Sequence, residues 1–214
     1  MIAVCLHGFL RSGFSMYFVE KELKKQGYKA VLSPSFALHT RTLDDHAQEL
    51  VKLVQEACTK HQATHVDVVT YSMGGLLFRA SLAYDIPYRR GVMIAPPNKG
   101  ASLAQLIRTY LPLQNIGWDP LHQLLPEQPM SLPIPDNIDI GIIAGIKGDG
   151  KGYNAFLPED NDGKVCVSET YLPMEVPHII VQGRHPMLII KPSVIAESVH
   201  FLAHGQFMER GATA

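Results

Sequence analysis

Residues 66–77 read VDVVTYSMGGLL, a β-branched apolar run that continues through one serine and two glycines into an apolar helical period. The first five residues have the composition of a buried strand, and Leu76, Leu77 and Ala80 recur at the spacing of a helix face. No linker separates the two patterns. The sequence therefore predicts a strand, a tight turn at Ser72 and a helix in immediate succession.

Strands and helices alternate along the rest of the chain. Apolar runs favour further strands at residues 2–6, 29–32, 91–95, 138–146 and 177–182. Helical periods with capping or stop residues occur at 14–26, 42–54 and 192–204. Because strands that alternate with helices form parallel sheets, we expect an α/β fold with a doubly wound, mostly parallel six-stranded sheet flanked by helices.

Size and composition indicate an ordinary globular protein. The chain has 214 residues, of which 46% are hydrophobic and 18% are charged, so we expect one domain over residues 1–214. Residues 103–135 break the alternation, and we interpret them as a small cap or lid, or as an apolar excursion packed on its own domain. Its apolar residues are candidates to line an acyl site: Leu106, Ile107, Leu111, Leu113, Trp118, Leu121, Leu124 and Leu125.

The charge balance argues against polyanionic partners. Nineteen basic and twenty acidic residues give a net charge of -1, which favours neither nucleic acid nor an anionic membrane surface. Cys5, Cys58 and Cys166 are odd in number and widely spaced, a pattern typical of unpaired thiols. The first apolar run is too short for a signal peptide or a membrane span, so we expect no transmembrane segment and a cytoplasmic location.

Ser72 is the strongest candidate for a catalytic residue. A serine hydroxyl is a weak nucleophile near neutral pH, so acyl transfer needs a base and fixed donors for the oxyanion. Gly74 and Gly75 allow a helix to approach closely behind the serine. The string TYSMG at residues 70–74 resembles the G-x-S-x-G elbow of the α/β-hydrolase family, with Thr70 at a position where related lipases use alanine or threonine.

Two further segments resemble small bacterial serine lipases and esterases. HGFL at residues 7–10 is similar to the H-G motif of lipases, and the resemblance implies that the backbone N–H groups of Phe9 and Met73 form the oxyanion hole. APPNKG at residues 95–100 resembles the segment after the fourth strand of the same group. We expect Asn98 or Ser102 to cap the helix that follows.

The order of the family, serine then acid then histidine, places the base among His178, His185, His200 and His204. His185 is best placed, because it follows the strand predicted at 177–182, at the end where an open α/β sheet gathers its site. His178 lies inside that strand, which favours a structural role in the core or at the sheet edge. His200 and His204 are one helical turn apart, but without an H-E-x-x-H context we expect no metal there.

Three aspartates compete for the role of the acid. Asp162 is our choice, because NDGKV at residues 161–165 resembles the N-D-G-x-V segment that carries the acid in small bacterial lipase-like hydrolases. Asp160 is the nearest rival and Asp149 the next. Some of these residues fall at the spacing of a calcium loop, but Pro158 at the first ligand position argues against calcium.

These residues imply a serine hydrolase that cleaves carboxylic esters through an acyl-enzyme. Ser72 would be the nucleophile, His185 the general base and Asp162 the carboxylate that orients the histidine. No cofactor is required, and the expected partner is a small-molecule acyl ester, apolar in character. Acyl transfer, thioester or amide cleavage by the same triad, or a catalytically silent binding protein, stay open as alternatives. The sequence carries no evidence on the oligomeric state or the physiological substrate.

Overall fold

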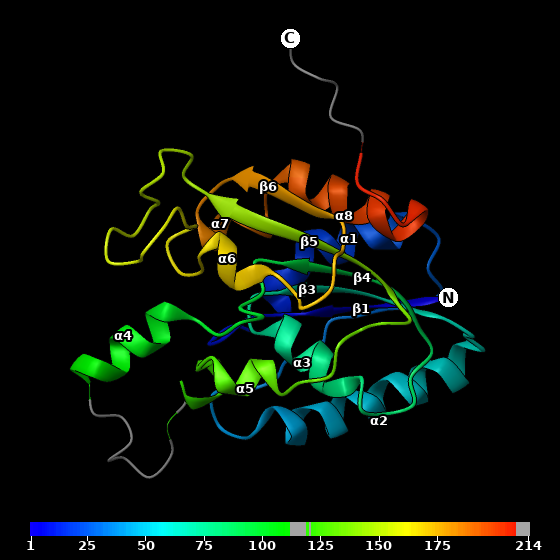
Figure 1. Cartoon of the computed structure of the whole chain (residues 1–214). Coiled ribbons are helices and arrows are strands. Elements are labelled where there is room, and N and C mark those ends of the chain that lie inside the picture. Colours follow the sequence, from blue (N-terminus) through cyan, green and yellow to red (C-terminus); the bar gives the residue numbers. More distant parts are fainter. Residues whose placement is uncertain (112–118, 120, 209–214) are drawn as a thin grey trace.

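A six-stranded sheet forms the centre of the computed structural model, which describes residues 1–111, 119 and 121–208 (Figure 1). All neighbouring strands are parallel and lie in the order β2-β1-β3-β4-β5-β6. The strands are β1 (Ile2–Leu6), β2 (Val31–Leu32), β3 (Val66–Tyr71), β4 (Tyr88–Ile94), β5 (Asp139–Ile146) and β6 (His178–Gln182). The predicted doubly wound parallel sheet is confirmed.

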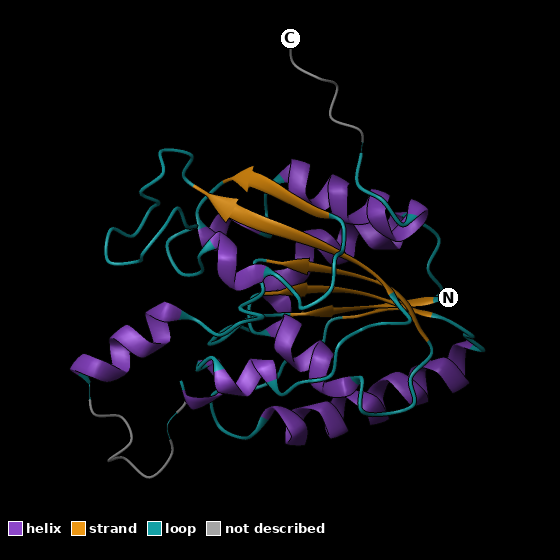
Figure 2. Cartoon of the chain, in the orientation of Figure 1, coloured by secondary structure: helices purple, strands orange, loops and turns teal. Residues whose placement is uncertain are grey.

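Helices cover both faces of this sheet (Figure 2). The covering helices include α1 (Tyr17–Lys25), α2 (Leu43–His61), α3 (Gly74–Ser81) and α8 (Pro192–His204). Leu50 and Leu77, from α2 and α3, belong to one buried cluster, whereas Val19 and Phe201, from α1 and α8, belong to a second. The sheet therefore has a hydrophobic core on each side, which explains why most residues of its strands are apolar.

The order of the strands determines where a site can form. The chain runs from β1 outward to β2 and then returns to β3 on the opposite side of β1. In an open α/β sheet, ligands bind outside the carboxyl ends of the strands at such a reversal. The residues that follow Leu6 and Tyr71 lie at this edge.

Local signals in the sequence account for most of the element boundaries. Thr42 and Asp45 form a reciprocal capping box at the start of α2, as the cap prediction requires. Gly205 ends α8 with a φ of 76°. Two boundaries differ from the prediction: the edge strand β2 is only two residues long, and the helix expected from residue 14 begins as a 3-10 turn, η1 (Gly13–Met16).

The segment between β4 and β5 holds short helices. They are α4 (Ser102–Tyr110), η3 (His122–Leu124) and α5 (Glu127–Met130), and α4 extends away from the sheet in Figure 1. Leu113 and Trp118 lie outside the described residues. The expected cap by Asn98 or Ser102 is wrong: the Glu169 carboxylate accepts from the N–H of Ser102 at 2.6 Å, because α6 (Val167–Thr170) packs beside this helix start.

Across the described residues, no helix is both long and apolar enough to cross a bilayer.

Two glycines bring α3 close to the sheet, as the sequence predicted. A Cβ atom at Gly74 would lie 2.4 Å from the carbonyl oxygen of Leu6, and one at Gly75 would lie 2.8 Å from Cε of Met93. The first contact is with backbone, which cannot move without displacing the end of β1. Only glycine therefore allows the helix to start directly behind Ser72.

We predict that Gly74→Ala lowers the free energy of unfolding by about 1–3 kcal/mol, because the added methyl group overlaps the Leu6 carbonyl. Chemical denaturation followed by circular dichroism measures the change. Gly183→Ala is the matched control, since its added methyl group meets only the flexible end of Leu188, at 3.0 Å. Equal losses in the two variants would contradict this account of the turn.

Candidate active site

Ser72 occupies the turn between β3 and α3 in a left-handed backbone conformation. Its φ is 53°, which is rare for a residue with a Cβ atom. The N–H of Ser72 donates to the carbonyl of Ile94 at 2.8 Å, which ties the turn to the end of β4. This arrangement holds Oγ 3.0 Å from Nε2 of His185, whose loop comes from the far end of the chain.

His185 is buried at the start of α7 (His185–Leu188) and is held at both ends. Its main-chain N–H donates to the carbonyl of Asp162 at 2.7 Å, and its Nδ1 lies 2.5 Å from Oδ2 of the same residue. A carboxylate accepts only, so Nδ1 carries the proton and Nε2 is left to accept from the Ser72 hydroxyl. The ring is therefore in the tautomer that a general base for serine requires.

The two carboxylate oxygens of Asp162 have different hydrogen-bond partners. Oδ1 accepts from the backbone N–H groups of Lys164 and Val165, both at 2.9 Å. Oδ2 faces His185. The side chain is buried, and these contacts satisfy it within a tight turn. The structure thus brings Ser72, His185 and Asp162 together in series, which is the arrangement expected from the sequence.

The rival candidates lie elsewhere. Asp160 accepts from the backbone of Lys147, Gly148 and Gly150. Its burial raises the pKa of the carboxyl group, but these hydrogen bonds outweigh it and hold the pKa below its ordinary value. Asp149 is exposed and pairs with Lys147. Neither makes a hydrogen bond to His185.

The other histidines also have partners away from Ser72. His178 begins β6, bonds the Thr170 hydroxyl at 2.9 Å and stacks on Tyr171. Its burial lowers the pKa of the ring. His200 and His204 have ring centroids 4.4 Å apart on α8, and no group of three or more candidate metal ligands occurs among the described residues.

The predicted oxyanion donors flank Ser72. A Cβ atom at Gly8 would lie 3.0 Å from Cβ of Ser72, so the loop that carries Phe9 packs directly against the serine. Met73 follows the serine and precedes α3. Within the described part of the chain, neither the Phe9 nor the Met73 N–H donates to another residue. Their role as oxyanion donors stays a prediction.

His7 fixes the conformation of the Phe9 loop. Its Nε2 accepts from the N–H of Phe36 at 2.8 Å, so Nδ1 carries the proton and donates to the carbonyl of Gly8 at 2.8 Å. Burial lowers the pKa of this ring below its ordinary value, because the charged form would lose its hydration. A neutral His7 thus connects the loop after β1 to the segment before α2.

Tyr71 is a site residue that the sequence analysis missed. Its hydroxyl donates to the carbonyl of His185 at 3.0 Å, and the two ring centroids lie 4.9 Å apart. Burial raises the pKa of the phenol, so it remains a donor at neutral pH. Its place at the last position of β3, beside the serine, was the one available signal.

A cavity of about 310 Å³ opens above Ser72 and His185. One wall is apolar and comes from α4 and from the residues around η3; it consists of Leu103, Ala104, Ile107, Leu121 and Leu124. These residues fall in the predicted excursion at 103–135, and Ile107, Leu121 and Leu124 were among its candidates for an acyl site. The cavity places apolar surface beside the serine hydroxyl.

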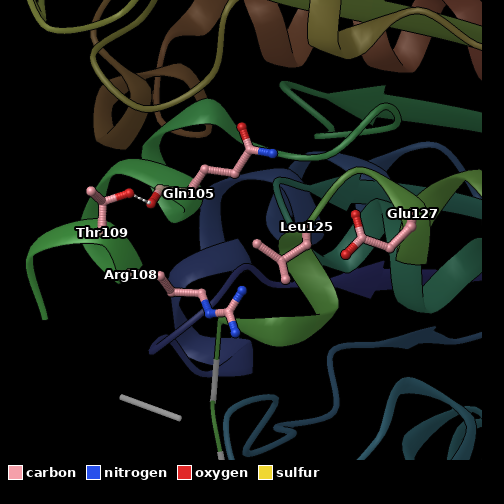
Figure 3. A pocket seen from close by; sticks show the side chains of 5 residues that line it. All are labelled: Gln105, Arg108, Thr109, Leu125 and Glu127. Atoms are coloured by element: carbon pink, nitrogen blue, oxygen red, sulfur yellow. Dashed lines mark hydrogen bonds between the residues drawn. The ribbon is translucent and has the colours of Figure 1, made fainter. Parts of the chain in front are cut away.

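A second cavity, of about 380 Å³, lies on another side of α4 (Figure 3). Gln105, Arg108 and Thr109 of α4 face it, together with Leu125 and Glu127. None of the three residues in the Ser72 series lines it. This second cavity therefore lies outside the candidate site.

Comparisons with known proteins agree with this fold. The model of the alpha/beta hydrolase family matches residues 3–163. A search of curated protein sequences gave no significant match. Among solved structures, the mature lipase BlEst2 from Bacillus licheniformis has a TM-score of 0.73 at 20% identity, over 95% of this chain and 91% of the lipase.

Two further structures show the same fold. A gene product from Listeria innocua gives a TM-score of 0.66 at 17% identity, over 99% of this chain and 96% of its own. A putative thioesterase from Silicibacter sp. TM1040 gives a TM-score of 0.60 at 19% identity, over 92% of this chain and 75% of the thioesterase. At these identities the likeness concerns the fold alone.

We predict that His7 contributes to the loss of stability in acid. The unfolded chain binds a proton near pH 6.5, whereas the folded ring binds it only at lower pH. The free energy of unfolding therefore falls as the pH drops through 6.5, with a slope of at most about 1.4 kcal/mol per pH unit from this group. His7→Asn, which removes the Nε2 acceptor, should reduce the slope measured by denaturation between pH 7 and pH 5.

His204→Asn, at an exposed histidine, controls for the loss of a histidine as such. An unchanged slope in His7→Asn would contradict the assignment of a neutral His7.

Proposed function

Because the chain belongs to the alpha/beta hydrolase family, we propose that it is a serine hydrolase that cleaves carboxylic esters through an acyl-enzyme on Ser72. The observation that supports the proposal is the hydrogen-bonded series from Ser72 Oγ to His185 to Asp162, with distances of 3.0 Å and 2.5 Å. A nucleophile, a base and an orienting carboxylate in contact are the arrangement that activates a serine.

In the first half of the reaction, Nε2 of His185 takes the proton of the Ser72 hydroxyl as Oγ attacks the ester carbonyl. The carbonyl oxygen becomes an oxyanion, to which Phe9 and Met73 donate their N–H groups. When the tetrahedral intermediate collapses, the bond to the leaving oxygen breaks and His185 gives its proton to the alcohol. The acyl group is then bound to Ser72.

Water completes the cycle by the same steps. His185 takes a proton from the attacking water, a second tetrahedral intermediate forms, and its collapse returns the proton to Ser72 and releases the acid. Asp162 stays ionised throughout, holds Nδ1–H in place and stabilises the imidazolium that forms. Every proton thus moves between groups that the protein, the ester or water supplies.

The apolar wall of the cavity supports an acyl group of small size. Five residues form this wall, and the cavity volume of about 310 Å³ is at the low end of the range of about 300–1,000 Å³ for small-molecule sites. Apolar side chains bury an acyl chain favourably, whereas they offer no partner to a polar one. We therefore place the acyl part of the ester against α4.

We predict that a fluorophosphonate probe labels the purified protein on Ser72. Ser72→Ala should abolish the labelling and the hydrolysis of short acyl esters, because among the described residues Ser72 Oγ is the hydrogen-bond partner of His185 Nε2. His185→Ala should reduce labelling strongly while leaving the serine in place. Gel fluorescence and peptide mass spectrometry measure both effects.

Ser15→Ala is a matched control, since the hydroxyl of Ser15 bonds only a neighbouring carbonyl. A wild-type protein that is folded and yet unlabelled would indicate a catalytically silent binding protein and would overturn the proposal.

We predict that Asp162→Asn and Asp160→Asn separate the two neighbouring carboxylates. Asp162→Asn should lower kcat by about 10⁴-fold, because an amide no longer enforces the tautomer of His185. Asp160→Asn should lower stability through the backbone of residues 147–150 and leave kcat within about threefold of the wild type. Steady-state kinetics on a short acyl ester measure the change in kcat, and thermal melts measure the change in stability. The reverse pattern would assign the acid to Asp160.

A further inference from the structure

Two cations stand in the wall of the candidate active site. Arg11 and Lys164 line the cavity above Ser72 and His185, and no aspartate or glutamate is among its described lining residues. Both side chains are exposed at the rim. The hydrolytic mechanism proposed above uses neither of them, so their presence calls for another explanation.

The protein holds both cations on the loops that carry the site. Arg11 follows Leu10 in the loop after β1, and its guanidinium carbon lies 5.6 Å from the ring centroid of Tyr71. Lys164 belongs to the turn that presents Asp162, to whose Oδ1 its backbone N–H donates at 2.9 Å. More than a hundred residues separate these loops in the sequence, and the fold brings them to the same cavity.

The two charges are not neutralised within the described part of the chain. Other cations have carboxylate partners, as in the pairs Arg89–Asp67 and Arg90–Asp139. Neither Arg11 nor Lys164 has an ion-pair partner among the described residues. Asp162 is the carboxylate nearest to Lys164 along the chain. Its oxygens accept from His185 and from the backbone of its own turn.

A third cation continues this positive side. The guanidinium carbon of Arg184, the residue before His185, lies 4.7 Å from the ring centroid of Tyr153. Arg184 lines an adjoining cavity of about 420 Å³ together with Lys164, His185 and one carboxylate, Asp162, which is hydrogen-bonded to His185. The chain as a whole has a net charge of -1, so the excess is local to the site. Charges of one sign in a concave, low-dielectric wall attract a ligand of the opposite sign.

The lining of the cavity therefore contains apolar residues from α4 and η3, and two cations on the loops after β1 and around Asp162. Because the proposed function places the acyl group against α4, the alcohol part is left to contact the loops that carry Arg11 and Lys164. We propose that the preferred substrates are acyl esters whose leaving alcohol bears an anionic group, a carboxylate or a phosphate. This inference rests on the proposed function, because it concerns the selectivity of the same site.

The test compares matched substrates that differ in one anionic group. The first pair is 4-(butanoyloxy)benzoate and its neutral amide, 4-(butanoyloxy)benzamide, each corrected for its rate of alkaline hydrolysis. The second pair is butyrylglycerol 3-phosphate and 1-butyrylglycerol, which distinguishes phosphate from carboxylate. The readout is the ratio of kcat/KM for the anionic ester to that for the neutral ester.

We expect this ratio to exceed one in the wild type and to fall by about fivefold for each cation removed, in Arg11→Gln, in Lys164→Gln and in the double variant. It should also fall as the salt concentration rises, since both cations are exposed. Arg11→Lys should keep most of the ratio. The double variant Lys52→Gln/Lys60→Gln removes the same total charge from α2, away from the cavity, and should leave the ratio unchanged.

Two outcomes overturn the inference in different ways. If neutral esters are hydrolysed and the double variant at residues 11 and 164 leaves the ratio unchanged, the selectivity is refuted and the proposed function stands. If none of the four esters is hydrolysed and Ser72 is not labelled, the selectivity and the proposed function are both refuted.

Discussion

A two-point link between Asp162 and His185 is the interaction on which the site depends. The main-chain N–H of His185 donates to the Asp162 carbonyl, and the ring Nδ1 meets the carboxylate of the same residue. Two loops from different strands are therefore held at one separation and one orientation. Tyr71 extends the link to the end of β3, where Ser72 follows. The reacting groups are thus ordered without a ligand, which limits the reorganisation that a reaction would need.

Local signals were sufficient to predict the fold. The strands are mainly apolar because helices cover both faces of the sheet, and the caps at Thr42 and Gly205 act within one turn of the helices they bound. The grouping of Ser72, His185 and Asp162 was also predictable, since all three follow strands whose carboxyl ends share one edge. The family resemblance narrowed the choice of acid, which spacing alone left open among Asp149, Asp160 and Asp162.

What the sequence could not reveal are contacts between distant residues. Tyr71 bonds His185 across 114 positions, His7 bonds Phe36 across 29, and Glu169 bonds the start of α4 across 67. Each of these bonds depends on which loops the sheet order brings together, and no local pattern encodes that. The expected cap at Asn98 or Ser102 was wrong for the same reason: a carboxylate from another element satisfies the helix N–H group first.

The charged residues of the site have two different proposed roles: Asp162 serves the reaction, whereas Arg11 and Lys164 serve the choice of ester. The negative charge of Asp162 is buried, and three hydrogen-bond donors contact it, one of them Nδ1 of His185. Arg11 and Lys164 have no such partner among the described residues and stand at the rim, where their field reaches a ligand. Under the proposed function, a change at the rim is expected to alter which ester is favoured, whereas a change behind His185 is expected to alter the rate for every ester.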